Sequence, residues 1–234
     1  MTAWQRKLGL IVPSWNTVNE YEFEQAIIPA MSLHTMRISH TADTEENFTW
    51  MGTQVPAAAK LLAHAKVEVI CYGCAAGGFI KGPEHDLEII RDIKEATGIP
   101  GVTSAAATAD ALRSLNVKRI SVASPYAPWL NEKLKQYLED CGFEVLAMQG
   151  LGTQAHAGFT PEQNAALAAE VDRAGSQAIF ISCSNFRTLE IIEPLEQKLG
   201  KPVVTSNMVS LWKMLRTIGD TRDIPGAGRL FREA

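Results

Sequence analysis

The sequence predicts an α/β protein made of two similar parallel-sheet halves, related by a pseudo-twofold axis, with the active site between them. Two pairs of matching segments support this prediction. Residues 67–74 (VEVICYGC) and 176–183 (SQAIFISC) are apolar β-type runs that each end in a cysteine. Residues 99–104 (IPGVTS) and 201–206 (KPVVTS) match in the same way. The two members of each pair lie 109 and 102 residues apart, so both halves carry the same landmarks in the same order.

The first half alternates short β-type runs with helical patterns. Its most distinct strand, 67–72, is a continuous apolar run, which is typical of a parallel strand buried on both faces. The helix over 84–96 is closed by Gly98 and Pro100, which together form a stop signal. The other elements expected here, in order, are a strand at 8–12, a helix at 18–31, a strand at 34–38, a helix at 55–65, a strand at 102–103 and a helix at 105–115.

The second half repeats this alternation and is followed by a turn-rich tail at 224–230. The expected elements, in order, are a strand at 119–123, a helix at 128–140, a strand at 143–148, a helix at 161–174, a strand at 178–182, a helix at 189–199, a strand at 203–205 and a last helix to about residue 218. Alternating strands and helices with short links imply right-handed crossovers and parallel sheets. We expect residues 1–110 with 206–234 to form one half, which includes a returning C-terminal helix and tail. Residues 111–205 form the other half.

The connection over 39–52 is polar and long for a link between a strand and a helix. Loops of this length are often functional lids, but a surface excursion without a role explains the pattern equally well. The sequence leaves both interpretations open.

Composition excludes several classes of protein. The chain has 234 residues, of which 46% are hydrophobic and 21% charged, as is ordinary for a globular protein. A net charge of −4 means that the chain has no excess of basic residues, which argues against a nucleic-acid-binding protein. The first residues lack the features of a signal peptide, and no apolar run reaches the roughly 20 residues needed to span a membrane. We therefore expect a cytoplasmic protein whose four cysteines are reduced thiols.

Cys74 and Cys183 are the candidate catalytic residues. In an open parallel sheet, ligands bind outside the carboxyl ends of the strands, where both cysteines are expected. Each is also expected to precede a helix, whose N-terminal N–H groups favour anionic sulfur. Buried core cysteines are the alternative, but the matched positions favour function. Cys71, inside a strand, and Cys141, at a helix end, are expected to be structural.

Further candidates follow the strand ends. They are Pro13, Ser14 and Asn16 after the first strand, Ala75 and Ala76 after Cys74, Tyr126 after the fifth strand, and Ser184 and Asn185 after Cys183. Asn16 can hold a carboxylate oxygen, cap the following helix, or do both. The histidines show no metal-site spacing, and the glycines of 77–82 form neither a Walker loop nor G-x-G-x-x-G. We expect no metal and no organic cofactor.

These segments resemble the Asp/Glu racemase superfamily, and within it the branch of maleate cis–trans isomerases and arylmalonate decarboxylases. The resemblance covers essentially the whole chain. Its anchors are residues 9–16 (GLIVPSWN), 72–74 (YGC), 182–187 (SCSNFR), 202–206 (PVVTS) and 225–231 (PGAGRLF). It implies two pseudo-symmetric α/β halves with the site between them.

The resemblance also narrows the reaction. Decarboxylases of this branch keep only the second cysteine, with glycine at the first position, whereas this chain has both Cys74 and Cys183. Isomerases have asparagine and tyrosine carboxylate ligands where Asn16 and Tyr126 stand. A third ligand, asparagine in those enzymes, falls near Gln154.

The implied function is conversion of maleate, or a related cis-dicarboxylate, to fumarate through a covalent adduct on Cys74. Cys183 either acts as the acid or stabilises the charge that develops on the far carboxylate. A two-cysteine racemase or a decarboxylase-like enzyme is the first alternative, and a non-catalytic small-acid binding protein is the second. The expected partner is a small dicarboxylate, with no nucleic acid and no membrane, and we expect a homo-oligomer, either a dimer or a tetramer.

Overall fold

The computed structural model describes residues 6–27, 30–154 and 156–234, which contain two four-stranded sheets with parallel pairing throughout. The order is β2-β1-β3-β4 in the first sheet and β6-β5-β7-β8 in the second. The first sheet consists of β1 (Arg6–Pro13), β2 (Met31–Ile38), β3 (Val69–Tyr72) and β4 (Gly101–Thr103). The second consists of β5 (Arg119–Ser124), β6 (Glu144–Gly150), β7 (Ala178–Ile181) and β8 (Val203–Thr205). The predicted fold class is confirmed, and the two sheets share one topology.

Helices cover the sheets, so that every residue of β3 and β7 is buried. Burial of such Val, Ile and Phe side chains stabilises a fold by about 1.5–3 kcal/mol each. The helices of the first part of the chain are α1 (Asn19–Ile27), α2 (Glu45–Ala63), α3 (Ala75–Phe79), α4 (Pro83–Thr97) and α5 (Ser104–Ser114). Those of the second part are α6 (Pro128–Asp140), α7 (Pro161–Val171), α8 (Ile192–Leu199), α9 (Ser206–Thr217) and α10 (Arg229–Glu233), with 3-10 turns η1 (His156–Gly158) and η2 (Leu189–Ile191). None of the described helices is both long and apolar enough to cross a bilayer.

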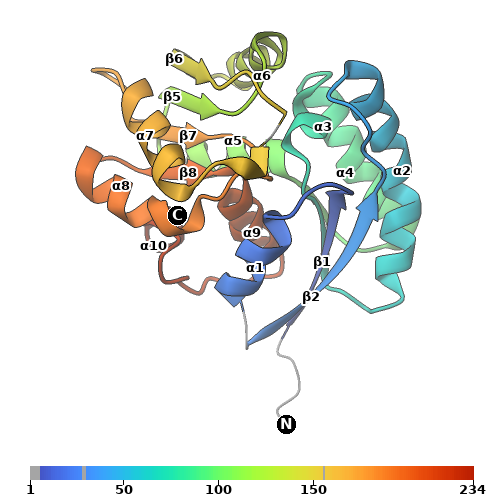
Figure 1. Cartoon of the computed structure of the whole chain (residues 1–234). Coiled ribbons are helices and arrows are strands. Elements are labelled where there is room, and N and C mark those ends of the chain that lie inside the picture. The colour runs from blue at the N-terminus through green and yellow to red at the C-terminus, as the bar shows by residue number, and fades with distance from the viewer. Residues whose placement is uncertain (1–5, 28–29, 155) are drawn as a thin grey trace.

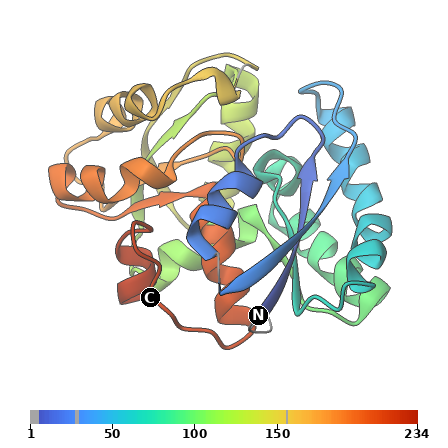
Figure 2. The same ribbon diagram turned by 60° about the horizontal axis from the view of Figure 1, so that its bottom comes forward.

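Helices α5 and α9 lie side by side between the two sheets (Figures 1 and 2). Each follows a Val-Thr-Ser sequence, and the threonine, Thr103 or Thr205, caps the helix with its side chain. The hydroxyl of Ser210 in α9 donates to that of Ser104 in α5 (2.8 Å). Both helices contact β4 and β8, one strand from each sheet. The repeated landmark at 99–104 and 201–206 therefore forms the centre of the molecule.

Two predicted helix boundaries are wrong. The helix expected over 18–31 ends at Ile27, and Met31 already begins β2. Residues 28 and 29 of that prediction lie outside the described residues. The helix expected over 55–65 begins instead at Glu45, after an N-cap at Thr44, and continues through Pro56. The long loop expected over 39–52 is therefore only residues 39–44.

The C-terminal segment contacts both sheets. Helix α9 packs on β3 and β4 of the first sheet and also on β8 of the second. The tail behaves differently, because Arg232 of α10 pairs with Glu193 of α8 (2.7 Å). The division into 1–110 with 206–234, and 111–205, stays a prediction.

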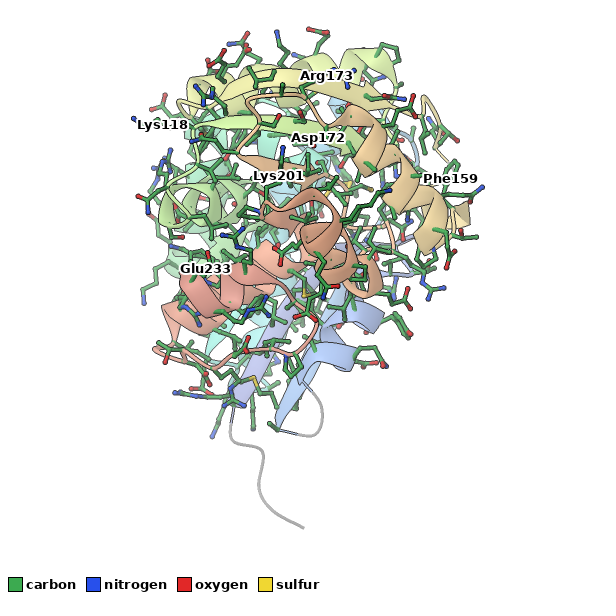
Figure 3. All side chains as sticks on the ribbon, turned by 90° about the vertical axis from the view of Figure 1, so that its left-hand side faces the viewer. Lys118, Phe159, Asp172, Arg173, Lys201 and Glu233 are labelled. Atoms are coloured by element: carbon green, nitrogen blue, oxygen red, sulfur yellow. The ribbon has the colours of Figure 1, made fainter. Side chains whose placement is uncertain are left out.

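On the face shown in Figure 3, Lys201 pairs with Asp172, the C-cap of α7 (2.8 Å).

Two buried carboxylates join the two parts of the chain. Glu22 of α1 accepts hydrogen bonds from the Leu189 amide (2.8 Å) and the Asn207 side chain (2.6 Å). Asp86 of α4 accepts one from the hydroxyl of Tyr137 in α6 (2.9 Å). Burial raises the pKa of Glu22 above 4.5, and it raises that of Asp86 to about 6.

Candidate active site

Cys74 lies two residues beyond the end of β3 and caps the N-terminus of α3. Its Sγ accepts a hydrogen bond from the Gly77 amide at 3.3 Å, as expected for a sulfur placed before a helix. The side chain is almost fully buried, and burial raises the pKa of the thiol to about 11, although the Gly77 amide and the Tyr72 phenol lower it in part. The resting side chain is therefore a neutral thiol.

Cys183 takes the equivalent place two residues beyond the end of β7. It was expected to precede a helix, and this is wrong, because the next helical element, η2, begins only at Leu189. Cys183 instead adopts a φ of +130°, held by a hydrogen bond from its amide to Ser206 Oγ (3.1 Å). Its Sγ accepts from the Asn185 amide (3.4 Å), and burial raises the pKa of the thiol to about 12.

Both cysteines line one small cavity of about 30 Å³, named here the thiol cavity. A cavity of this size holds a few water molecules at most, so a dicarboxylate needs some of the wall to move. Nine of the residues expected in the site line it: Pro13, Asn16, Cys74, Ala75, Ala76, Tyr126, Cys183, Ser184 and Asn185. Segments from both sheets thus meet at one site.

Asn16 joins the two sides of the cavity. Its amide oxygen accepts from the backbone of Val18 (3.0 Å) and Asn19 (2.9 Å), so it caps α1 as one of the two predicted roles requires. Its amide nitrogen donates to Ser184 Oγ across the site (3.1 Å). This N–H group faces the cavity and can be redirected to a ligand oxygen.

Two expected ligands lie outside the cavity. Ser14 is exposed, and its hydroxyl accepts a hydrogen bond from the His40 amide (3.0 Å), so it supports the wall rather than lining it. Gln154 is exposed too, and His156 lines the cavity in its place. The correction arises because the link after β6 is irregular, so that no periodicity fixes which residue points inward.

Five residues of the cavity were not predicted: Trp15, His40, Asp43, Phe48 and His156. His40 and Asp43 belong to the loop 39–44 between β2 and α2, and His156 belongs to the link between β6 and α7. These two connections are equivalent in the two sheets, so corresponding loops meet over the thiols. The polar composition of 39–52 could have indicated His40 and Asp43 as residues of the site. No such feature surrounds His156 in the sequence.

The polar groups of these loops make direct contacts. His156 Nδ1 lies 3.4 Å from Cys183 Sγ, and His156 Nε2 lies 3.7 Å from Asp43 Oδ2. His40 Nε2 lies 3.3 Å from the other oxygen of Asp43. Burial lowers the pKa of His156 below 6.5, and Asp43 offsets part of this effect. Among the described residues, no group of three or more His, Cys, Asp or Glu side chains is arranged to hold a metal ion.

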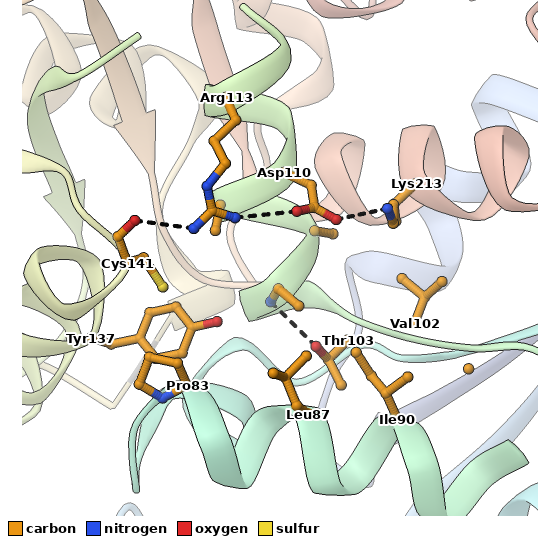
Figure 4. Close-up of a pocket in the computed structure, with 14 residues that line it drawn as sticks. Pro83, Leu87, Ile90, Val102, Thr103, Asp110, Arg113, Tyr137, Cys141 and Lys213 are labelled. Atoms are coloured by element: carbon orange, nitrogen blue, oxygen red, sulfur yellow. Dashed lines mark hydrogen bonds and ion pairs between the residues drawn. The ribbon is translucent and has the colours of Figure 1, made fainter. Parts of the chain in front are cut away.

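A second, larger cavity of about 300 Å³ lies beside α4 and α5 (Figure 4). Its charges are already paired, since Asp110 contacts both Arg113 (3.3 Å) and Lys213 (2.6 Å). Cys141 lies on its edge, but Cys74 and Cys183 do not line it. Size alone therefore does not make it the reactive site, whereas the thiol cavity gathers His40, Asp43 and His156 beside two sulfurs.

Comparison with known proteins gives a consistent result. The sequence model of a family described as arylmalonate decarboxylase matches residues 8–231. A maleate isomerase from Pseudomonas putida is 30% identical over 244 residues, which cover 97% of this chain and 98% of that protein.

Two solved structures are similar over nearly the whole chain. One is a cysteine-to-alanine variant of a Pseudomonas putida maleate isomerase with maleate (TM-score 0.93, 26% identity, 98% of each chain). The other is a cysteine-to-serine variant of the Nocardia farcinica maleate cis–trans isomerase with a covalently bound succinylcysteine intermediate (TM-score 0.92, 26% identity, 98% of this chain and 99% of that chain).

Proposed function

Since this chain belongs to the arylmalonate decarboxylase family, we propose that it is a cofactor-independent maleate cis–trans isomerase that works through a covalent cysteine adduct. The observation that carries this proposal is the pair of free thiols, Cys74 and Cys183, on one cavity at equivalent strand ends. Similarity to maleate isomerases along the full chain supports the same substrate class. Location in the cytoplasm and assembly into a homo-oligomer stay predictions.

Cys74 is the nucleophile in this proposal. Its thiolate adds to C2 of maleate, the S–C2 bond forms, and the electron pair of the double bond moves onto C3 and its carboxylate as an enediolate. The Cys183 thiol then protonates C3, which leaves a C2–C3 single bond that rotates. The Cys183 thiolate then takes a proton back from C3, and Cys74 leaves C2 as a thiolate. The double bond re-forms, and the product is fumarate.

The cavity supplies neutral donors for the two carboxylates. Asn16 offers an amide N–H, and Tyr126 offers a phenol whose pKa burial keeps well above 10, so it stays a donor. Asn185 and Gly77 present backbone N–H groups at the two sulfurs. Such fixed donors stabilise the enediolate charge at little reorganisation cost.

The test is conversion of maleate to fumarate followed by proton NMR, with intact-mass analysis of each variant. Wild type should turn over. We expect Cys74→Ala to lose turnover and form no adduct, and Cys183→Ser to lose about 10²–10⁴ in rate and accumulate an adduct on Cys74. Cys141→Ala, outside the thiol cavity, is the matched control and should behave as wild type. An adduct on Cys183 in the Cys74→Ala protein, with turnover retained, reverses the assignment.

A two-cysteine racemase is the second candidate. The contact of His156 with Cys183 favours it to some degree, because an imidazole can make that thiol a base. A racemase exchanges the α-hydrogen of its substrate with solvent, so incubation of single-enantiomer amino and hydroxy acids in deuterium oxide distinguishes the two activities.

A further inference from the structure

Cys183, His156 and Asp43 form a row in the wall of the thiol cavity. The imidazole ring stands between the sulfur, 3.4 Å from Nδ1, and the carboxylate, 3.7 Å from Nε2. The side chains of His156 and Asp43 are each only 8% exposed. In enzymes, an imidazole between a thiol or hydroxyl and a carboxylate takes a proton from the first and is oriented and stabilised by the second.

A structural role does not account for this row. A buried carboxylate is costly unless its oxygens are well hydrogen-bonded, and apolar side chains often pack more favourably in its place. Oδ1 of Asp43 faces His40 Nε2 at 3.3 Å without hydrogen-bond geometry, and Nε2 of His156 has no hydrogen-bond partner in the described part of the chain. Costly polar groups that line a cavity beside a reactive thiol indicate function.

The proposed isomerisation, on which this inference rests, leaves one proton without an assigned place. Cys74 and Cys183 start as two thiols, because burial raises the pKa of both. Addition to maleate needs a thiolate on Cys74 and a thiol on Cys183. One of the two thiol protons must therefore move to another group before the S–C2 bond forms.

We propose that His156 takes this proton at Nδ1, with Asp43 as the residue that positions the ring and stabilises its cation. The S–H bond of Cys183 breaks, its electron pair stays on sulfur, and the Nδ1–H bond forms from the ring lone pair. The Cys183 thiolate then accepts the Cys74 proton across the shared cavity. Cys74 is now the thiolate, Cys183 is again the thiol, and His156 holds the extra proton until fumarate leaves. The site regains its starting protonation when these transfers reverse.

Several groups face His156 and set its proton affinity. Burial lowers its pKa most, Asp43 and a hydrogen bond with the Thr153 backbone raise it, and the neighbouring His40 lowers it. The ring of Tyr126 lies edge-on at 5.6 Å, and Cys183 faces Nδ1. A thiolate at Cys183 adds a strong attraction for the imidazolium, because charges interact strongly in a buried site. This attraction offsets the effect of burial in the two states in which Cys183 is a thiolate, directly after it gives its proton to His156 and again after it protonates C3.

The first experiment measures kcat/KM for maleate against pH. In wild type the proton stays inside the site, so kcat/KM should be level above the pKa of His156, below 6.5, and fall at lower pH. In His156→Asn the proton must leave to solvent. For this variant we expect kcat/KM to be lower than in wild type by a factor of about 10²–10⁴ at neutral pH. Its kcat/KM should then rise about tenfold per pH unit up to the pKa of the thiol.

Two further variants are controls for this profile. His40→Asn removes the other imidazole that contacts Asp43, and this imidazole contacts no sulfur. The variant should keep the level region of the kcat/KM profile, even if the value of kcat/KM there changes. Asp43→Asn should keep the level region but move the acid limb to lower pH, because loss of the carboxylate lowers the pKa of His156. A His156→Asn profile parallel to wild type, only lower, assigns His156 a structural role and overturns the proposal.

The second experiment needs no turnover. Nitrogen NMR of ¹⁵N-histidine-labelled wild type and Cys183→Ser should show resting His156 with its proton on Nε2 and a bare Nδ1. A proton on Nδ1 at rest overturns the proposal, because that nitrogen could not then accept the thiol proton. If wild type fails to isomerise maleate while the Nε2–H form is found, the proposed function is wrong and the His156–Cys183 pairing stands.

Discussion

Cys183 combines a reactive thiol with a backbone conformation that favours glycine. Its φ of +130° is one of three positive values among the described non-glycine residues, and it is far from the left-handed helical region that the other two, Lys66 and Asn116, occupy. Such conformations cost on the order of 1–3 kcal/mol and persist where the surroundings impose them. Here the Ser206 hydroxyl and the Asn185 amide hold the backbone and the sulfur. The strain keeps the sulfur against His156.

This strain has a measurable consequence for stability. We expect Cys183→Gly to be more stable than Cys183→Ala by about 1 kcal/mol, because glycine adopts this φ without strain. Cys74 has an ordinary φ of −122°, so there the order should reverse, with alanine the more stable. Urea unfolding of the four variants measures both differences. The same order at both positions contradicts the argument.

At the residue scale, the internal repeat of the sequence identified the two cysteines of the site, but it gave no sign of His156. The repeat predicted that Cys74 and Cys183 stand at equivalent strand ends, and the structure places both on one cavity. His156 has no counterpart in the repeat, and only the fold brings it to Asp43, 113 residues away. The family resemblance places a third ligand near Gln154, but a loop without periodicity does not fix which of its residues faces inward.

At the element scale, the two sheets end corresponding helices in the same way. Helix α4 ends at Gly98 with φ +73°, and α8 ends at Gly200 with φ +70°. Both glycines precede the matched segments that lead into β4 and β8. Each N–H donates to a carbonyl four residues back, Lys94 or Glu196, which closes the last turn.

Replacing either cap should cost similar stability. Nothing lies within 4 Å of a Cβ added at Gly98 or Gly200, so the only penalty for alanine is the backbone conformation, about 1 kcal/mol. Gly52, inside α2, is the control for the same substitution. An added Cβ there meets His85 at an ordinary 3.7 Å, so alanine should stabilise the protein by up to about 1 kcal/mol. The denaturant midpoints of the three variants test whether stability falls at Gly98 and Gly200 and rises at Gly52.

Elements with a strong pattern were predictable from the sequence, whereas the shortest helices were not. The buried apolar runs of β3 and β7 were found at nearly their true bounds. Helices α3 and α10 have five residues each, too few for a periodic pattern. The first turns of α2 are polar and Pro56 follows, so the sequence indicated a loop where the Thr44 cap in fact begins a helix.

At the scale of the whole molecule, two buried carboxylates tie the two parts of the chain together. Glu22 bonds to Leu189 and Asn207, and Asp86 bonds to Tyr137. The packing of the two parts thus depends on contacts between segments far apart in sequence. No local pattern could have predicted these pairs, because each needs both sheets in place.

Asp86 should make stability depend on pH. Burial raises its pKa to about 6 in the folded protein, against an ordinary value of 3.8, so between these two pH values the folded state binds more protons than the unfolded chain. Stability from this group is therefore present at low pH and lost as pH rises through that window, by an amount on the order of 2–3 kcal/mol.

The test compares Asp86→Asn with wild type by unfolding from pH 4 to 8. The amide keeps an acceptor for Tyr137 and has no proton to lose, so the variant should gain on wild type up to about pH 6 and then stay level. Glu22 is present in both proteins, so its own titration cancels. Asp92→Asn, exposed on the same helix, should show a constant difference at every pH. A constant difference for Asp86→Asn as well would refute the expectation.

The meeting of two corresponding loops over the thiols also bears on how the chain can evolve. A duplicated gene begins with the same loop twice, and each copy can then diverge without disturbing the sheets below. Here one copy supplies the carboxylate of Asp43 and the other the imidazole of His156. Substrate range can therefore change through residues 39–44 and 151–160 while the thiol pair is inherited unchanged. Directed evolution toward new acids should concentrate its libraries on these two short segments.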